Sequence, residues 1–401
     1  IGERSKNRKE NVGIVLMDFI IEKMKKMPSY KKQIKGEKLV KFNNTYNLLS
    51  KKMTNPISII DCYRMLQDQM MIVNDFHSNI YFDCEYFNKE DYEDEEKLES
   101  FIHSENFKNH PKTTKNLSTL KNNLETKTID DFEGVYNFGE KVTVGIYKTN
   151  ENEYDAVVLT SDTKIWKPGQ IKFTAKRNEF GKYDVLAYDD FTRKLIMVKN
   201  LTFENGRVWK YKKTSNPNNF EVEINNKTNW DFKQLNSDTQ YVYFGNFSSF
   251  SSKNKKAFKD FYEANKTNFK SAKHIIIDLR GNGGGNKKLS DPFLKLFKNS
   301  RAKLYVLTNS FTGSNAEQFS VKLKKIKGTT HLGQTTYGLI SYGLNYGNSY
   351  KTPSNYFSIL PTDMNYHEFY EYEGYGVSPD IKLDFNSDWI KQTLDIIKSN
   401  N

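Results

Sequence analysis

The alternation of strand-like and helix-like segments after about residue 238 is the feature that most limits how this chain can fold. Short apolar runs of strand length are separated by longer runs in which apolar residues recur every three or four positions. We expect strands at residues 241–247, 274–279 and 304–307, and helices that begin at Ser252, Pro292, Ser314 and Trp389. Alternating strands and helices form a sheet covered by helices, so the sequence predicts an α/β core over residues 238–401.

The first part of the chain predicts an N-terminal helical region at residues 1–87. Apolar residues lie near helical spacing over residues 10–75. One helix is expected to begin at Asn55-Pro56, a pair that suits an N-cap and a first helical turn. This helix leads into residues 74–77, which are followed by a short strand-like run.

Two further segments lie between the helical region and the α/β core. Residues 88–131 are polar and charged, and we interpret them as a mixed linker with some helix. Residues 132–237 hold short strand-like runs separated by turn signals. The sequence therefore predicts a β-rich antiparallel middle module, built as a small barrel or a sandwich.

Composition limits the class of protein and its partners. Of the 401 residues, 37% are hydrophobic, which supports packed cores and excludes a disordered chain. The longest apolar stretch is far too short to cross a bilayer, so we expect no transmembrane segment. The net charge of +12 is dispersed, without an Arg-rich strip or a nucleic-acid-binding motif. We expect no nucleic-acid partner, while attraction to an anionic membrane surface stays open.

The first residues of the chain bear on where the protein is located, and its cysteines bear on disulfides and metal binding. The chain begins Ile-Gly-Glu without an initiator Met, so we expect that a signal peptide has been removed. The expected location is the bacterial cell envelope or the extracellular medium. Cys62 and Cys84 are too few for a disulfide framework or a four-cysteine zinc site, and whether they pair stays open. We expect no metal ion and no organic cofactor.

A glycine-rich loop at residues 280–286 follows the strand at 274–279. Consecutive glycines let the backbone turn sharply and present its N–H groups to a ligand. A dinucleotide fingerprint is not matched, because Asn286 stands where a third glycine is required. A phosphate-binding P-loop is not matched either, because Lys287 is followed by another lysine. An oxyanion hole and a flexible turn without function remain as interpretations.

Ser314 stands thirty residues later, at the expected start of a helix. In the structural interpretation, Ser314 and Glu317 form an S-x-x-E capping box. In the functional interpretation, the hydroxyl lies after a strand and Gly313, where the N–H of Asn315 and the helix dipole favour a nearby oxyanion. The two interpretations are compatible.

Four motifs follow one another in the C-terminal part of the chain. Residues 278–285 read D-L-R-G-N-G-G-G, and residues 312–317 read T-G-S-N-A-E. Residues 333–338 read G-Q-T-T-Y-G, and residues 376–380 read G-V-S-P-D. In this order they resemble the D-L-R-x-N-x-G-G, T-x-S-x-x-E, G-x-x-T-x-G and G-[IV]-x-P-D motifs of the tail-specific, or C-terminal processing, serine proteases. The resemblance implies a crotonase-like α/β core and hydrolysis of a polypeptide substrate.

One position departs from the family pattern. Many members carry a catalytic lysine directly after the T-x-G turn, and Leu339 stands there, which excludes a Ser–Lys dyad at this site. The branch that resembles the tricorn core protease and the interphotoreceptor retinoid-binding proteins carries D-x-H near its N-terminal helices. Residues 75–77 match that motif, and Glu373 matches a Glu before the last motif. The tricorn type has a further Ser where this chain has Phe76.

This resemblance implies a complete set of site residues. They are the catalytic residues Ser314, His77 and Glu373 and the oxyanion-hole residues Gly283, Gly284 and Asn315. Ser314 is expected to be the nucleophile and His77 its general base, with Glu373 or a neighbouring carboxylate supporting the imidazole. A histidine base with an ordinary pKa implies that activity falls below about pH 6.5.

Two other functions stay open. Retinoid-binding relatives keep the scaffold for apolar ligands, so a non-catalytic binding protein on the same fold is the main alternative. A role in binding nucleic acid or anionic surfaces through the positive charge is the third. The β-rich module stands where many relatives have a PDZ domain, but it lacks a G-L-G-like carboxylate-binding loop, so binding of a free C-terminus is not implied. The oligomeric state also stays open.

Overall fold

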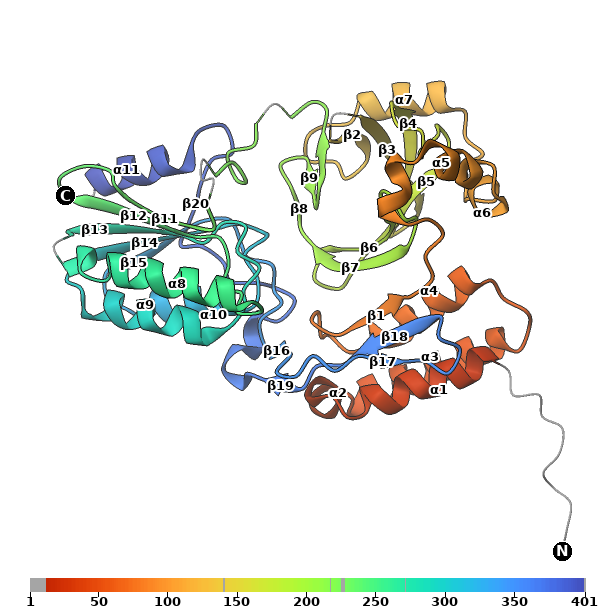
Figure 1. The fold of residues 1–401 in the computed structure, drawn as a ribbon, viewed down its shortest axis with the longest axis horizontal. Coiled ribbons are helices and arrows are strands. Elements are labelled where there is room, and N and C mark those ends of the chain that lie inside the picture. Colours follow the sequence, from red (N-terminus) through yellow and green to blue (C-terminus); the bar gives the residue numbers. More distant parts are fainter. Residues whose placement is uncertain (1–11, 140, 217, 225–227, 271, 400–401) are drawn as a thin grey trace, which may run out of the picture. The chain divides into compact units, whose positions relative to one another are not determined.

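The computed structural model describes residues 12–139, 141–216, 218–224, 228–270 and 272–399. Residues 1–11, the start of the predicted helical region, lie outside the described residues. The chain divides into two compact units (Figure 1). The N-terminal unit comprises the residues up to Ser215 together with Tyr342–Asn365, and the C-terminal unit comprises Asn216–Ser341 and Tyr366–Asn401.

The N-terminal unit begins with helices and a small sheet. The helices are α1 (Val12–Met24), α2 (Pro28–Gln33), α3 (Gly36–Met53) and α4 (Ile59–Met70). The sheet has the order β1 (Asn79–Phe82), β18 (Phe357–Leu360), β17 (Tyr350–Lys351), and its strands are antiparallel. Helix α4 begins later than predicted, because the Ser58 hydroxyl caps it by accepting from the Asp61 N–H. Cys62 and Cys84 are free thiols.

The predicted antiparallel β-rich module follows. Its described strands form one sheet in the order β7-β6-β5-β4-β3-β2-β10-β9-β8 rather than the two sheets of a sandwich. The strands are β2 (Gly134–Phe138), β3 (Val142–Asn150), β4 (Glu153–Ser161), β5 (Ile171–Arg177), β6 (Tyr183–Tyr188), β7 (Leu195–Leu201), β8 (Phe203–Glu204), β9 (Arg207–Val208) and β10 (Tyr211–Lys213). Before them come η1 (Lys89–Glu93), α5 (Glu95–Ile102), α6 (Glu105–Lys108) and α7 (Leu117–Glu125), so the predicted linker is partly helical.

The C-terminal unit is built on a mostly parallel sheet. Its order is β11 (Trp230–Gln234), β12 (Thr239–Phe244), β13 (His274–Asp278), β14 (Lys303–Thr308), β15 (Thr329–Gly333) and β20 (Ile381–Lys382). Only β11 runs antiparallel among these described strands. The helices are α8 (Ser252–Asn265), α9 (Lys287–Asn299), α10 (Asn315–Lys324) and α11 (Trp389–Ser399), with short η2 (Asn268–Lys270) and η3 (His367–Tyr372).

Helices cover both faces of this sheet (Figure 1). Along β13, Ile275 and Ile277 belong to the core on the side of α8, α9 and α10, while Ile276 packs with Trp389 of α11. The three layers confirm the predicted α/β core. Strands β13 and β14 are parallel neighbours, so the loops after Asp278 and after Thr308 leave the same edge of the sheet. Ligand sites of α/β sheets commonly lie at that edge.

The predicted boundaries differ from the structure in two places. Strand β11 lies in the range predicted for the β-rich module, yet it pairs with β12 of the C-terminal sheet. Residues 342–365, predicted to be part of the core, belong to the N-terminal unit, where β18 pairs with β1. The same segment also forms the short pair β16 (Tyr342–Gly343) and β19 (Met364–Asn365). No helix in the described parts of the chain has the length and hydrophobicity needed to span a membrane.

Candidate active site

Ser314 occupies a strained turn between strand β14 and helix α10. Its backbone angles are φ 53° and ψ −125°, a region that residues with a side chain rarely adopt. Such a conformation costs on the order of 1–3 kcal/mol and persists only where the surroundings impose it. A nucleophilic serine on a sharp strand-to-helix turn has the same kind of strained backbone. Ser314 also forms the expected capping box with Glu317, whose Oε2 accepts from the Ser314 N–H at 2.9 Å.

Gly284 of the glycine-rich loop packs directly against Ser314. A Cβ atom on Gly284 would lie 2.6 Å from the Ser314 Cβ and 2.8 Å from the Asn315 nitrogen. The φ of Gly284 is +97°, so its conformation also favours glycine. Its N–H donates to Asn282 Oδ1 at 2.8 Å, whereas Gly283 is exposed, with open space around its Cα. Of the two glycine donors predicted for the oxyanion hole, Gly283 is therefore the better placed to receive a ligand.

Gly284→Ala is expected to destabilise the C-terminal unit by at least about 2 kcal/mol, because it combines overpacking with a positive φ. Gly283→Ala is the matched control, since its Cβ would meet nothing within 4 Å. Chemical denaturation followed by Trp fluorescence measures both variants. Equal midpoints for the two would contradict the close packing of Gly284 on Ser314.

The first two motifs are joined by buried hydrogen bonds. The Gly313 N–H donates to the Asn282 carbonyl at 2.9 Å, and the Asn282 side chain donates to the Phe244 carbonyl at 2.9 Å. Thr312 Oγ1 donates to the Leu279 carbonyl at 2.9 Å. Both side chains are fully buried. They fix the glycine-rich loop and the turn of Ser314 to each other.

Glu317 joins the second motif to the third. Its fully buried carboxylate accepts from Thr336 Oγ1 at 2.6 Å, from the Gly338 N–H at 2.7 Å and from the Leu339 N–H at 3.0 Å. The Leu339 carbonyl in turn accepts from the Ser314 N–H at 2.9 Å. The sequence identified Glu317 as a helix cap and as the last residue of the T-x-S-x-x-E motif. Its S-x-x-E spacing gave no signal that it also holds the turn at residues 336–339.

The fourth motif closes this network. The Val377 N–H donates to Thr336 Oγ1 at 2.7 Å. Gly376 has φ +86°, and a Cβ there would lie 2.2 Å from the Thr336 carbonyl oxygen. The four motifs that are far apart in the sequence therefore form one continuous hydrogen-bonded structure around Ser314.

Glu373 is buried and lies close to the position of the missing lysine. Its Oε2 accepts from the Ile340 N–H at 2.9 Å and from the Ser341 N–H at 2.7 Å. These are the residues that directly follow Leu339. The neighbouring carboxylates that could instead support the imidazole, those of Glu368 and Glu371, are exposed. The structure thus brings Ser314, Gly283, Gly284, Asn315 and Glu373 into one unit.

His77 lies in the N-terminal unit, in the loop between α4 and β1. Neighbouring Asp75 is buried, and its carboxylate accepts from Thr362 Oγ1 at 2.5 Å and from the Ser78 N–H at 3.1 Å. Burial lowers the pKa of His77 to about 4, and the Asp75 carboxylate opposes this shift. The imidazole is therefore neutral at physiological pH, which is the form that accepts a proton.

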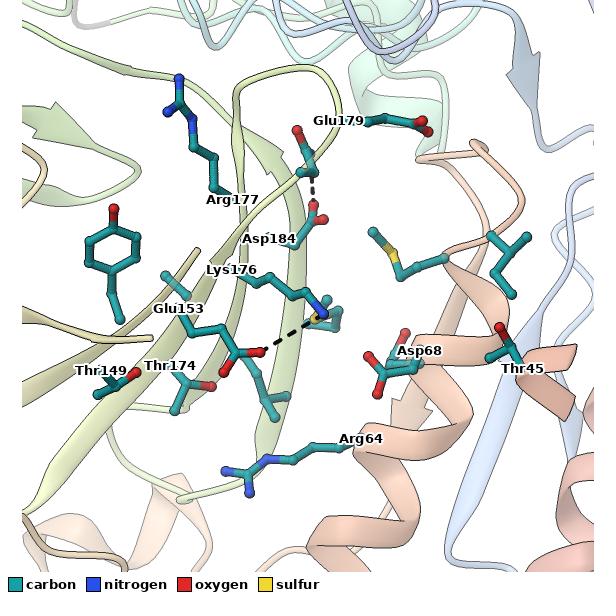
Figure 2. A pocket seen from close by; sticks show the side chains of 18 of the residues that line it. Thr45, Arg64, Asp68, Thr149, Glu153, Thr174, Lys176, Arg177, Glu179 and Asp184 are labelled. Atoms are coloured by element: carbon teal, nitrogen blue, oxygen red, sulfur yellow. Dashed lines mark hydrogen bonds and ion pairs between the residues drawn. The ribbon is translucent and has the colours of Figure 1, made fainter. Parts of the chain in front are cut away.

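A cavity of about 910 Å³ lies within the N-terminal unit, lined by helices α3 and α4 and strands β3 to β7. Figure 2 shows Glu153 and Lys176 on neighbouring strands, 3.9 Å apart, with Asp68 of α4 across the cavity. Asn74 and Glu179 also line it and are hydrogen-bonded to each other at 2.7 Å. The cavity therefore borders the loop that carries His77. Over the described residues, no group of three or more His, Cys, Asp or Glu side chains is placed to hold a metal ion.

Comparison with known proteins agrees with the motifs. The model of peptidase family S41 matches residues 241–302 and 288–383. No curated protein matches the chain. Among solved structures, a lipoprotein from Streptococcus agalactiae is 11% identical, with 100% of this chain and 99% of that chain covered and a TM-score of 0.41. The photosystem II D1 C-terminal processing protease is 14% identical, with coverage of 93% and 94% and a TM-score of 0.38.

Mature CPAF is 10% identical, with 96% of each chain covered and a TM-score of 0.46. The family match covers all four motifs and the strands and helices that hold them, and it confirms the resemblance seen in the sequence. Residues 241–383 of this chain thus match the model of peptidase family S41.

Proposed function

We propose that this protein is a serine endopeptidase that cleaves polypeptides through an acyl-enzyme on Ser314. The observation that carries the proposal is the backbone of Ser314, held at φ 53° and ψ −125° between a strand and a helix. A helix cap alone needs no such strain, because N-cap residues ordinarily take extended angles. Strain of this kind is characteristic of functional sites.

The proposed oxyanion hole consists of the N–H groups of Asn315 and Gly283. Asn315 is the residue after the nucleophile and the first residue of α10, where the helix dipole favours negative charge. Gly283 belongs to the loop whose next residue packs on Ser314. Donors fixed before the reaction stabilise a developing oxyanion without reorganisation.

His77 is the proposed general base. It takes the proton of Ser314 Oγ as that oxygen attacks the carbonyl carbon, and then gives the proton to the leaving amine as the C–N bond breaks. Water hydrolyses the ester in a second cycle of the same kind. Asp75 anchors the loop of His77 in its own unit. Glu373 holds the backbone of residues 340–341, and we assign it a supporting role.

The proposed fold of the C-terminal unit is crotonase-like. Its support is the mostly parallel sheet between two helical layers and the order of the four motifs. Leu339 stands where a catalytic lysine is expected, so the proposal requires a base from elsewhere in the chain.

A fluorophosphonate probe tests the proposed activity, because it reacts with an activated serine and forms a stable adduct. We expect labelling of the native protein, loss of labelling after heating, and a single modified peptide that contains Ser314 on mass spectrometry. Absence of labelling at pH 7–9 together with binding of an apolar ligand would favour the non-catalytic alternative.

A further inference from the structure

A β-bulge next to the loop of His77 sets the direction of one buried lysine. In the pairing of β6 with β7, Tyr183 is opposite Leu201 and Val185 is opposite Val198, so two residues of β7 lie against Asp184. The second of these, Asn200, has φ 58°, and its N–H donates to Asp184 Oδ1 at 2.7 Å. Bulges commonly redirect a side chain near a functional site.

The other bulge residue, Lys199, points out of its own sheet and into the loop of His77. Its side chain is buried, with the residue 6% exposed, and Nζ donates to the carbonyl of Ser78 at 2.8 Å. Asp75 and Asp184 are the anions that favour its charged form. A buried ammonium group is costly unless it is paired, and here the Ser78 carbonyl and the charges of Asp75 and Asp184 offset that cost.

We propose that Lys199 is a positioning residue for His77, one that fixes the loop of residues 74–78 to the β-rich module and balances the charge of Asp75. The inference rests on the proposed role of His77 as general base. On this proposal the β-rich module contributes to the active site, because it holds the loop that carries His77 in place.

Other contacts between the module and the loop agree with this role. The Asn74 side chain donates to Glu179, in the turn between β5 and β6, at 2.7 Å. The rings of Phe76 and Phe180 pack edge to face, with their centroids 5.8 Å apart. Gln33 of α2 accepts from the N–H of Asn74 at 3.0 Å and donates to its carbonyl at 2.8 Å. The loop is therefore held by α2 as well as by the β-rich module, and Lys199 donates to it at Ser78, the residue next to His77.

The charge of Lys199 also affects the proton affinity of His77. Asp75 raises the pKa of His77 against the effect of burial. The Lys199 ammonium interacts electrostatically with the same carboxylate, and we expect it to offset the negative field of Asp75 at His77. Loss of this cation leaves Asp75 uncompensated, so the pKa of His77 rises.

A second buried lysine offers a matched control. Lys172 of β5 is fully buried and donates to the Tyr188 carbonyl at 3.3 Å and to Asp190 at 2.6 Å. Like Lys199, it donates to a backbone carbonyl and its charge is favoured by a carboxylate, but both of its partners lie within the β-rich module. A purely structural effect of removing a buried lysine is common to both sites, whereas an effect on His77 is expected at Lys199 alone.

The test compares Lys199→Met with Lys172→Met in the full chain, by NMR titration of the imidazole signals. The His77 signals are identified by their absence in His77→Gln. In Lys199→Met we expect the pKa of His77 to rise by about one pH unit, with the acid limb of kcat/KM moving by the same amount. Lys172→Met is expected to leave the pKa of His77 and the acid limb of kcat/KM unchanged. An unchanged pKa of His77 in Lys199→Met, or an equal rise in both variants, overturns the proposal.

A measurement on the native protein covers the case in which Lys199→Met does not fold. Burial lowers the pKa of Lys199 to about 8, so its deprotonation falls in an accessible range. The His77 signals are expected to show a second, smaller inflection near pH 8, and their constancy between pH 7 and 9 contradicts the proposal. Because the NMR readouts do not depend on turnover, they remain interpretable even if Ser314 proves not to be the nucleophile.

Discussion

Replacing Ser314 with Ala is expected to lower kcat/KM for a peptide substrate by about 10⁴-fold or more, because no other group can form the acyl-enzyme. Fluorophosphonate labelling is expected to disappear at the same time. Peptide cleavage followed by mass spectrometry measures the loss. Ser310→Ala is the matched control, since it changes a hydroxyl in the same connection between β14 and α10. Undiminished hydrolysis by Ser314→Ala contradicts the assignment of the nucleophile.

The strain at Ser314 adds a test that activity alone does not provide. Glycine tolerates φ 53° without penalty, and it costs only a few tenths of a kcal/mol as an N-cap. Alanine keeps the strain and loses the cap, at a cost of about 1 kcal/mol. We therefore expect Ser314→Gly to be more stable than Ser314→Ala by about 1–2 kcal/mol, although both are inactive. Equal denaturation midpoints indicate a relaxed turn at this position.

The turn that carries Ser314 could be predicted because its signals are local. A strand, a glycine, a serine and a helix follow one another within a dozen residues around Ser314, and each has its own sequence pattern. The strand before the glycine-rich loop was likewise visible as the apolar run of β13. The α/β core followed from the same periodicity, although α9 begins at Lys287, before the predicted start at Pro292.

The bonds that hold the site together could not be predicted, because they join residues far apart in the chain. Glu317 accepts from Thr336, 19 residues later, and Thr336 Oγ1 in turn accepts from Val377, 41 residues later. Nothing in the pattern of either segment specifies the partner. The pairing of β1 with β18 likewise joins segments far apart in the chain, and no local pattern indicates that residues 342–365 group with the N-terminal unit.

The glycines of the glycine-rich loop share a residue type but have different roles in the structure. Three consecutive glycines suggested equivalent N–H donors, but the structure gives them different tasks. Gly284 is required for packing against Ser314, and its N–H is taken by Asn282. Gly285 lies so close to Phe247 that a Cβ would be 2.1 Å from the Phe247 carbonyl oxygen. Only Gly283 meets open space, and the sequence contained no signal that distinguished it.

His77→Gln is expected to lower kcat/KM by about 10²–10⁴-fold, the range that a general base contributes. Glutamine keeps a hydrogen-bonding group of similar size but cannot accept the Ser314 proton. His103→Gln is the control, because His103 is an exposed histidine of the same unit. Full activity of His77→Gln with a small ester substrate contradicts the role of base.

The pH profile of the native enzyme gives the sharper form of this prediction. The sequence alone implied an acid limb near pH 6.5, but burial of His77 lowers its pKa to about 4. The neutral base therefore persists, and ester hydrolysis is expected to decline only as the pH approaches about 4. Between pH 6.5 and 4 the unfolded state binds a proton that folded His77 does not, so the same shift lowers the stability of the native protein as the pH falls. Trp fluorescence recorded at each pH separates unfolding from protonation of the base. An acid limb near pH 6.5 in fully folded protein, unchanged in His77→Gln, shows that another group accepts the proton of Ser314.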